Sequence, residues 1–278
     1  MISYPSLPIS ILMATYIRDD AGQLGESLSS LYQQTALPQE IILVCDGPIS
    51  QEQEQVISEF LLRETPTLRL VRLEKNRGLA GALNAGLEQC ICPWIARMDA
   101  DDISLPERLQ QQWDYLQAHP DVDLLSTWAA EFSETVDAVE CIKDCPEKHD
   151  DIVRVLTRRN TLCHPSVLFR AEAVQRVNGY STTVGLMEDY DLFIRLAESG
   201  ARLASVQAPL IGVRISAAQR LRRGGFDYIR KEWGFRLALL RRGFIDLKTF
   251  LWVGAAMTIF RLAPPSLKKM MYDTVRKK

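Results

Sequence analysis

Four short runs of apolar and β-branched residues, separated by segments with helical spacing, are the feature that most constrains the fold of this chain. The runs are ISILMA (9–14), EIILVC (40–45), LRLVRL (68–73) and WIARM (94–98). Leucines recur at helical spacing between the first and second runs, and again between the third and fourth. Strands that alternate with helices in this way predict right-handed crossovers and a largely parallel sheet, buried on both faces.

Polar residues follow each of these four runs. In sheets of this kind, ligands bind at the carboxyl ends of the strands, so the residues at those ends are the first candidates for a site. They are Thr15 and Tyr16, Asp46 and Gly47, Asn76 to Gly78, and Asp99 to Asp102.

The fourth strand end holds three aspartates within four positions, Asp99, Asp101 and Asp102. Carboxylates this close raise each other's pKa unless a cation neutralises them. Mg²⁺ or Mn²⁺ is suited to this, because it binds through one or two carboxylates and completes its shell with substrate phosphates. The stretch therefore predicts a site for a metal ion and a diphosphate. A structural alternative is that an aspartate, or Ser104 with Glu107 at capping-box spacing, caps the helix that follows.

The other strand ends are compatible with a bound nucleotide. Tyr16 could stack on a base or pack in the core, and Asp46 could accept a hydrogen bond from a base or only form an Asp-Gly turn. Arg77, beside Gly78, could approach a phosphate or belong to a simple turn. Further along the chain, the pattern predicts a helix over 106–119, strands over 123–132 and 164–170, a turn at 178–180 and a helix over 188–199.

Charge is distributed very unevenly along the chain. Residues 1–200 hold 16 Lys and Arg against 31 Asp and Glu, whereas residues 201–278 hold 17 against 4. The formal charges are therefore −15 and +13, although the whole chain carries only −2. This asymmetry suggests an anionic partner for the C-terminal part, or mutual neutralisation of the two parts.

The basic part has the pattern of amphipathic helices. Apolar residues follow one predicted helical face, namely Phe226, Ile229, Trp233, Leu237 and Leu240. Arginines and lysines, Arg236 among them, occupy the rest of that helix, and a second apolar segment follows over 250–262. Such helices are typical of anionic membrane surfaces, and a helical subdomain packed on the core is the alternative.

Several features bear on the cellular compartment. No apolar run reaches the ~20 residues of a spanning helix, and the N-terminus lacks the pattern of a signal peptide. The six cysteines show no paired spacing for zinc and lie mostly in apolar surroundings, as expected of reduced thiols. We therefore expect a cytoplasmic protein that is peripheral to a membrane.

Several of these stretches, in their order and at their separations, resemble a family 2 glycosyltransferase with the GT-A fold. They are ILMATY, SLSSLYQQT, EIILVCDGP, NRGLAGALNAGL, IARMDADD and MEDYDLFIRL. The resemblance covers about residues 7–215. It implies a GT-A catalytic domain over 1–215 and leaves 216–278 as a basic helical region that could attach to a membrane surface.

The resemblance also implies roles for individual residues. Thr15, Tyr16 and Asp46 match the nucleoside-binding part, and Asp99 and Asp101 match the acidic positions that hold ribose, diphosphate and metal. Asp189 matches the catalytic base, with Glu188 beside it in contact with the acceptor. Two departures, Ile17 where many relatives have Asn and Cys45 where many have Asp, leave the recognition of the base open.

HPSVLFR (164–170) resembles a segment of family members that assemble bacterial exopolysaccharide and O-antigen. This implies transfer of a hexose, with galactose favoured, from a UDP-sugar to a lipid-linked saccharide at the inner face of the cell membrane, with inversion and with Mn²⁺ or Mg²⁺. His164, Arg214 and Arg220 could then contact the acceptor or a diphosphate. A buried structural histidine explains His164 equally well.

Two other function classes share parts of this pattern. A nucleotidyltransferase that makes sugar nucleotides would also place carboxylates at strand ends, but it usually has a Gly-rich, basic loop after the first strand, and ATYIRDDAGQ is not one. A nucleic-acid-binding module would explain the basic part. Its acidic counterpart would repel phosphates and no nucleic-acid motif is present, so we expect no nucleic-acid partner.

Overall fold

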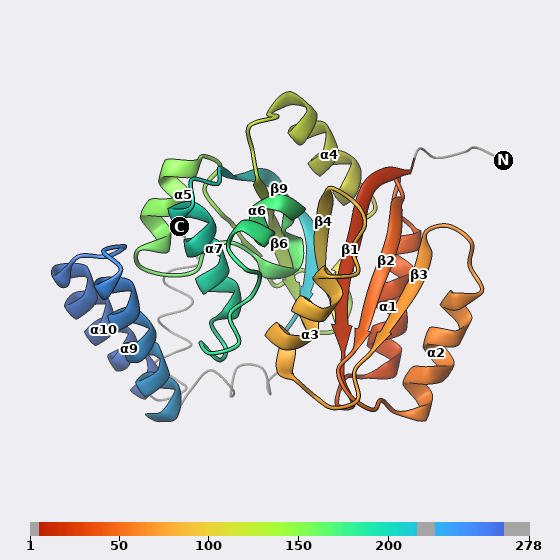
Figure 1. Ribbon diagram of the computed structural model, residues 1–278, viewed down its shortest axis with the longest axis horizontal. Helices are drawn as coiled ribbons and strands as arrows, with labels where there is room; N and C mark the ends of the chain where they lie inside the picture. The colour runs from red at the N-terminus through yellow and green to blue at the C-terminus, as the bar shows by residue number, and fades with distance from the viewer. Residues whose placement is uncertain (1–5, 216–225, 264–278) are drawn as a thin grey trace.

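A nine-stranded sheet with helices on both faces forms the centre of the protein (Figure 1). The structure is a computed structural model that describes residues 6–215 and 226–263. The strand order is β3-β2-β1-β4-β8-β6-β9-β5, and β7 pairs with β6.

The first half of the sheet is parallel, as the sequence predicted. β1 pairs with β2 and β4, and β2 pairs with β3, all in parallel register. The strands are β1 (Leu7–Thr15), β2 (Pro38–Cys45), β3 (Thr67–Arg72) and β4 (Trp94–Asp99). The intervening helices are α1 (Ala21–Tyr32), α2 (Gln51–Leu61) and α3 (Gly78–Leu87). This half brings the polar strand ends predicted from the sequence to one edge.

The second half of the sheet mixes strand directions. Its strands are β5 (Ile103–Ser104), β6 (Leu124–Phe132), β7 (Cys141–Lys143), β8 (Leu168–Arg170) and β9 (Leu203–Arg214). β6 and β9 are parallel, whereas β8 is antiparallel to both β4 and β6. β5 is antiparallel to β9, and β7 to β6. The parallel arrangement therefore applies to the part of the sheet that carries the candidate nucleotide site.

The strand predicted over 164–170 is wrong in its first half. A single 3₁₀ turn, η1 (His164–Ser166), precedes the short strand β8. Pro165 has no N–H to donate to a strand ladder. Ser166 instead accepts a hydrogen bond from the backbone N–H of Thr127 at 3.0 Å, which fixes the turn against β6.

The predicted helix near 106 begins two residues later, without the expected cap. The helices of this half are α4 (Arg108–Ala118), α5 (His149–Leu156), α6 (Ala171–Arg176) and α7 (Glu188–Glu198). Ser104 lies in β5, and Glu107, at the N-cap position of α4, makes no side-chain capping bond. The alternative that the aspartates or Ser104 merely cap α4 is therefore wrong. Asp102 instead accepts the backbone N–H of Arg214, at 2.8 Å.

Two apolar layers cover the sheet, one on each face. Alternate residues of the central strands enter different layers, as a strand requires: Ile11 and Met13 belong to one, and Leu12 to the other. The first layer is completed by α1, α2 and α4, and the second by α3, α6 and α7. Arg97, Asp99 and the start of α7 lie on the side of the second layer, since Ile95 of the same strand belongs to it.

A helical hairpin, α9 (Phe226–Arg241) and α10 (Leu247–Leu262), lies beside α7 (Figure 1). The apolar face predicted for α9 is wrong in part, because Phe226 is 79% exposed while Phe235 and Leu239 are buried. The cause is that α9 is covered on two sides. Phe235 packs on Tyr190 of α7, with ring centroids 5.2 Å apart.

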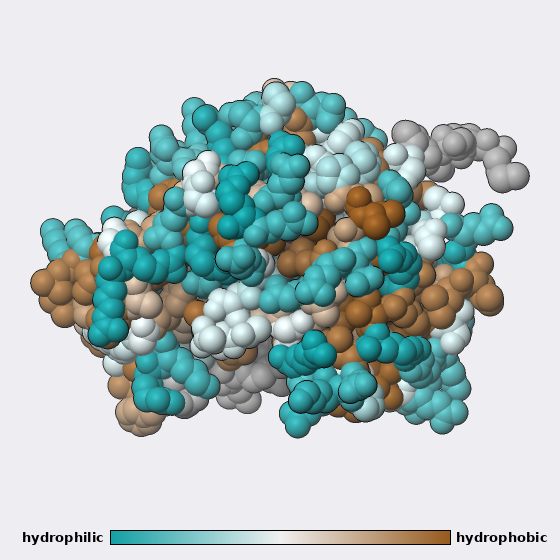
Figure 2. Space-filling view, viewed as in Figure 1, coloured by the Kyte–Doolittle hydropathy of each residue, from teal (hydrophilic) through white to brown (hydrophobic). Residues whose placement is uncertain are grey.

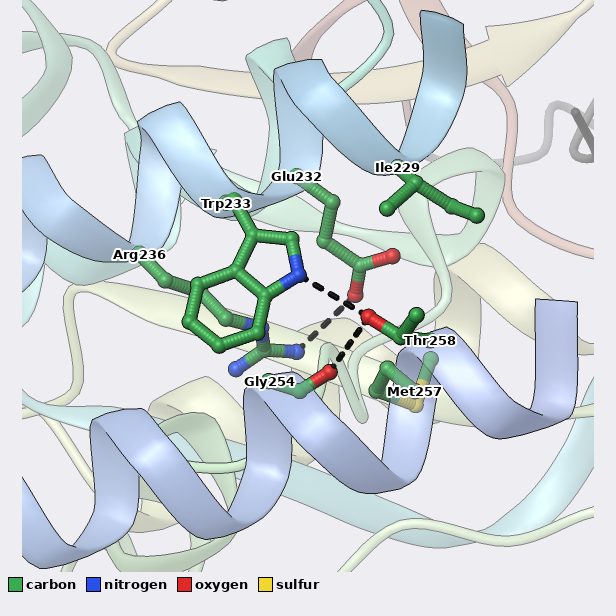
Figure 3. Close-up of a pocket in the computed structure, with 7 residues that line it drawn as sticks. All are labelled: Ile229, Glu232, Trp233, Arg236, Gly254, Met257 and Thr258. Atoms are coloured by element: carbon green, nitrogen blue, oxygen red, sulfur yellow. Dashed lines mark hydrogen bonds and ion pairs between the residues drawn. The ribbon is translucent and has the colours of Figure 1, made fainter. Parts of the chain in front are cut away.

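The second covered side of α9 faces α10. Trp233 packs on Phe250 at 5.1 Å and donates its indole N–H to Thr258 Oγ1 at 2.9 Å (Figure 3). Arg236, expected on the charged face, is 2% exposed and forms an ion pair with Glu232 at 3.0 Å. No helix in the described part of the chain is long and apolar enough to cross a bilayer.

Gly86 allows α3 to lie close to the sheet, which makes its replacement a test of this packing. A Cβ added there would lie 2.4 Å from Leu12 Cδ1 and 2.8 Å from Val44 Cγ2, and both side chains are fully buried. We expect Gly86→Ala to lower the free energy of unfolding by ~1–3 kcal/mol, because overpacking outweighs the ~1 kcal/mol that alanine gains inside a helix. Urea unfolding midpoints measure the difference.

Gly25→Ala in α1 is the matched control. Its added Cβ would meet the nearest atom, Val56 Cγ1, at an ordinary 3.4 Å, so the variant should be as stable as the wild type or slightly more stable. If Gly86→Ala proved as stable as Gly25→Ala, the close approach of α3 to the sheet would be wrong.

Candidate active site

The carboxyl ends of β1, β2 and β4 meet at one edge of the sheet. The register places Thr15 opposite Cys45 and Ala14 opposite Asp99. The backbone N–H of Asp46 donates to the carbonyl of Thr15 at 2.8 Å, which joins the first two strand ends directly. Candidate residues far apart in the sequence are therefore neighbours here.

Asp46 organises the loop that follows β3. Its Oδ1 accepts the backbone N–H of Arg77 at 2.6 Å, and its carbonyl accepts the side-chain amide of Asn76 at 3.2 Å. Gly47 has a φ of 86°, and a Cβ there would lie 2.8 Å from the backbone nitrogen of Asn76. Thr15, Tyr16, Asp46 and Arg77 thus belong to one connected edge, with Tyr16 half-buried and Arg77 exposed.

Asp19 is a member of this edge that the sequence analysis missed. Its Oδ2 accepts the backbone N–H of Tyr16 at 3.0 Å and the hydroxyl of Thr15 at 3.1 Å. Burial raises the pKa of Asp19 to about 6, and the charges of Asp101 and Asp99 raise it further against these hydrogen bonds. The sequence offered one signal, an aspartate three residues after Tyr16, but Asp20 beside it is the actual cap of α1.

The aspartates after β4 form a partly buried acidic cluster. Burial, and then the neighbouring Asp99, raise the pKa of Asp101 to about 6. Asp102 is 2% exposed, and burial followed by the charges of Asp99 and Asp101 raises its pKa well above the ordinary value. The electrostatic strain expected from the sequence is therefore present at this strand end.

Two arginines contact this cluster. Arg97 Nη2 lies 2.5 Å from Asp99 Oδ1, and the Arg97 side chain is 1% exposed. Arg214, on β9, donates from Nε to the carbonyl of Asp101 at 3.0 Å and from Nη2 to Glu26 at 2.6 Å. Arg214 was among the predicted acceptor or diphosphate contacts, whereas Arg97 was missed. The other predicted arginine, Arg220, lies outside the described residues.

Glu188 and Asp189 begin α7 on the side of the sheet that carries Asp99. Asp189 Oδ2 accepts the side-chain amide of Asn160 at 2.8 Å, and its Oδ1 accepts the backbone N–H of Tyr190 at 2.7 Å. Burial, and then Asp189, raise the pKa of Glu188 to about 7, and Asp99 raises it as well. The acidic residues of β4 and of α7 therefore act on each other electrostatically.

His164 is held inside the protein by Tyr180. Its Nε2 lies 2.9 Å from the Tyr180 hydroxyl, and the side chain packs edge-on against Phe193. Asn84 of α3 fixes Tyr180 through hydrogen bonds to its backbone N–H and carbonyl, both at 2.8 Å. Burial, and then the charge of Arg97, lower the pKa of His164 well below its ordinary value. These contacts suit a neutral, structural histidine, one of the two roles that the sequence left open.

The carboxylates of the acidic cluster suit a divalent cation whose remaining ligands are water and substrate phosphates. Within residues 6–215 and 226–263, no group of three His, Cys, Asp or Glu side chains is arranged as a complete metal site. Two carboxylates, Asp99 and Asp101, are what Mg²⁺ or Mn²⁺ uses when water and substrate phosphates complete its shell. Burial and the charge of Asp99 raise the pKa of Asp101, and a bound cation would lower it again by stabilising the ionised carboxylate.

The buried carboxyl of Glu188 predicts a pH dependence of stability. Its pKa rises from 4.5 to about 7 on folding, so the folded protein keeps a proton that the unfolded chain has lost. The stabilisation is complete below the unfolded pKa and disappears as the pH rises through about 7. From about pH 6 to pH 8 the free energy of unfolding of the wild type should fall by ~1 kcal/mol more than that of Glu188→Gln, which has no proton to lose at this position.

Thermal unfolding across this pH range measures the effect, which should amount to a few degrees in melting temperature. Glu59→Gln, on the exposed face of α2, is the control and should keep the wild-type slope. A slope in Glu188→Gln equal to that of the wild type would show that Glu188 is not protonated in the folded protein.

Similar proteins were found over most of the chain. Residues 10–176 match the model of Glycosyl transferase family 2. The amylovoran biosynthesis glycosyltransferase AmsE of Erwinia amylovora is 35% identical over 271 residues, which cover 96% of this chain and 99% of AmsE. A UDP-Gal:α-D-GlcNAc-diphosphoundecaprenol β-1,3-galactosyltransferase of Escherichia coli is 33% identical over 266 residues, or 96% of this chain and 95% of that enzyme.

The fold has a solved counterpart. The mannosyltransferase PcManGT of Pyrobaculum calidifontis, in complex with GDP-Man and Mn²⁺, aligns with a TM-score of 0.57 at 18% identity, over 99% of this chain and 80% of that one. This likeness confirms the GT-A fold expected from the sequence. The family model and the two relatives lead to one conclusion: the chain belongs to glycosyl transferase family 2.

Proposed function

We propose that the protein is a metal-dependent, inverting hexosyltransferase of bacterial surface polysaccharide synthesis. In this proposal it moves a hexose, galactose in the first instance, from a UDP-sugar to a hydroxyl of a polyprenyl-diphosphate-linked saccharide. The observation that carries it is the arrangement of two acidic groups on one side of the sheet. Asp99 ends β4 and Asp101 follows in the next turn, whereas Asp189 lies in the first turn of α7, where Asn160 holds its carboxylate.

The strand-end residues support a nucleoside diphosphate as the donor. Tyr16 and Asp46 would contact the nucleoside, with Thr15 and Arg77 on the same edge. Asp99 and Asp101 would hold ribose and Mn²⁺ or Mg²⁺. A divalent ion at this position neutralises the charge that develops on the leaving diphosphate.

Asp189 supplies the remaining chemistry. With a diphosphate as the leaving group, no general acid is needed, unlike in a glycosidase, which uses a pair of carboxyl groups. One base suffices to take the proton from the acceptor hydroxyl as its oxygen attacks C1 from the opposite face. Asp189 Oδ2 or Oδ1 would accept that proton, Asn160 fixes the orientation of the carboxylate, and Glu188 would contact the acceptor.

The acceptor class rests on the relatives and on the basic side of the site. The galactosyltransferase of E. coli is named for a diphosphoundecaprenol-linked acceptor. Arg214 contacts the acidic cluster, and its side chain is 12% exposed, so it could reach a diphosphate at the edge of the site. We assign residues 1–215 to the catalytic domain and 216–278 to a membrane-facing region.

Two variants separate donor binding from chemistry. We expect Asp101→Ala to lose the Mn²⁺-dependent thermal shift with UDP, because it removes a ligand of the metal–diphosphate pair. Asp189→Asn should keep this shift and lower turnover by ~10²–10⁴-fold, the usual contribution of a general base. A thermal-shift panel of UDP, GDP, dTDP and CMP with and without Mn²⁺, followed by transfer assays, measures both.

A ligand that binds only the folded state adds ~2.7 kcal/mol of stability at a hundredfold excess over its dissociation constant, so the shift is easily detected. Absence of a shift with every nucleotide would remove the donor site from the proposal. Turnover near that of the wild type in Asp189→Asn would remove the base.

A membrane surface is proposed for α10. Its outer face exposes the adjacent residues Leu251 (53%) and Trp252 (66%) and, about two helical turns further on, Ile259 (66%). Figure 2 shows apolar residues gathered at the end of the molecule where this hairpin lies. The C-terminal part of the chain carries the excess of positive charge. An apolar helix face combined with basic residues suits the interface of an anionic bilayer, here the inner face of the cell membrane.

Trp252→Ser should weaken binding to vesicles that contain phosphatidylglycerol by about tenfold, because the indole supplies much of the buried apolar area. High salt should weaken binding of the wild type as well. Leu62→Ser, at an 87% exposed residue beside α2, is the control and should bind normally. Equal binding of Trp252→Ser and wild type in a sedimentation assay would rule out this face of α10 as the attachment surface.

A further inference from the structure

Arg97 is the most unusual buried side chain of the site. It lies on β4, two residues before Asp99, and its side chain is 1% exposed. It forms an ion pair with Asp99, from Nη2 to Oδ1 at 2.5 Å. Among the described residues, Nε and Nη1 of this guanidinium have no hydrogen-bond partner.

This arrangement lowers the stability of the folded protein. A buried guanidinium with unpaired N–H groups loses hydration that its protein contacts do not replace. Arg108, the other fully buried arginine of this region, is better satisfied, because it donates to the Arg97 carbonyl at 2.8 Å and to Gln112 at 3.1 Å. A site that retains an unsatisfied cation behind its carboxylates is organised for a negatively charged ligand rather than for stability alone.

The position of the cation limits what Asp99 can do. Arg97 occupies Oδ1 from the interior, which leaves Oδ2 for a ligand on the exposed side, where the Asp99 side chain is 33% exposed. The carboxylate is therefore fixed in orientation before any donor arrives. The same contact places a permanent positive charge directly behind the Asp99 carboxylate, which is a proposed ligand of the metal ion.

We propose that Arg97 is a positioning residue that disfavours the divalent cation alone at this site and favours the anionic nucleotide diphosphate. This inference rests on the proposed donor site. A doubly charged ion at Asp99 and Asp101 is repelled by Arg97, and salt screens this repulsion little because the guanidinium is buried. UDP is an anion, and its complex with the ion still carries a net negative charge, so Arg97 attracts both.

The consequence is an order of loading. Arg97 weakens the binding of Mn²⁺ alone and strengthens the binding of the anionic nucleotide. Mn²⁺ is therefore held weakly until UDP is present, because attraction between the ion and the diphosphate then tightens the binding of both ligands by the same factor. The structure thus assigns Arg97 a function in the order of loading, without contact with the reacting atoms.

Calorimetric titrations of the full chain with MnCl₂ alone, and with UDP at saturating Mn²⁺, test the proposal. The neutral variants are Arg97→Met, which keeps the bulk of the side chain, and Arg97→Gln, which can still donate to Asp99. We expect either variant to bind Mn²⁺ alone more tightly, and UDP at saturating Mn²⁺ more weakly, each on the order of tenfold. Arg97→Lys keeps the charge and should keep most of both wild-type affinities.

The outcomes are distinguishable. Circular dichroism and thermal melts identify the folded variants, and one folded neutral variant is sufficient. Mn²⁺ and UDP affinities that are both unchanged in that variant would overturn the role of Arg97, as would changes of the same size in Arg97→Lys. A wild-type protein that binds no UDP in the presence of Mn²⁺ would instead overturn the proposed function.

Discussion

Parallel pairing of β1 with both β2 and β4 is the constraint on which the site depends. It forces three carboxyl strand ends to one edge, so that Thr15, Asp46 and Asp99 become neighbours although up to 84 positions separate them in the sequence. Side-chain contacts then lock the loops beyond the strands: Asp46 holds the backbone of Arg77, and Asp19 holds that of Tyr16. The loops are thus fixed by the same carboxylates that make the edge acidic.

The acidic edge is stable only because the structure supplies cations to it from two directions. Arg97 reaches Asp99 from inside the sheet, and Arg214 reaches the Asp101 carbonyl from β9. Neither removes the strain, because burial and mutual repulsion still raise the pKa of Asp101 and Asp102. A bound metal ion would therefore stabilise the ionised carboxylates further. A nucleotide diphosphate that binds beside the ion would in turn hold the ion at the site.

Local signals in the sequence were sufficient for the strands and for the polar strand ends. Apolar runs predicted β1 to β4, and the acidic start of α7 was recognised from EDYD. Contacts between distant segments were not predictable: Asn160 lies 29 positions before Asp189, and nothing in its neighbourhood indicates that contact. The contact of Arg97 with Asp99 was predictable, because residues two apart on a strand lie on the same face of the sheet. The buried face of α9 was misjudged because one periodic stripe cannot describe a helix covered on two sides.

The double burial of α9 also connects the two ends of the proposed mechanism. Phe235 packs on Tyr190, which follows Asp189 directly, and Arg242 forms an ion pair with Asp191 at 3.3 Å. Arg236 donates to the carbonyl of Arg158, two residues before Asn160. The hairpin that would rest on the membrane therefore braces both the helix that carries Asp189, the proposed base, and the segment that leads to Asn160. In the proposed mechanism, the acceptor is anchored in the bilayer and the base is held by the hairpin that binds the same bilayer. Both groups are then already oriented relative to the membrane, so less orientational freedom is lost when they meet.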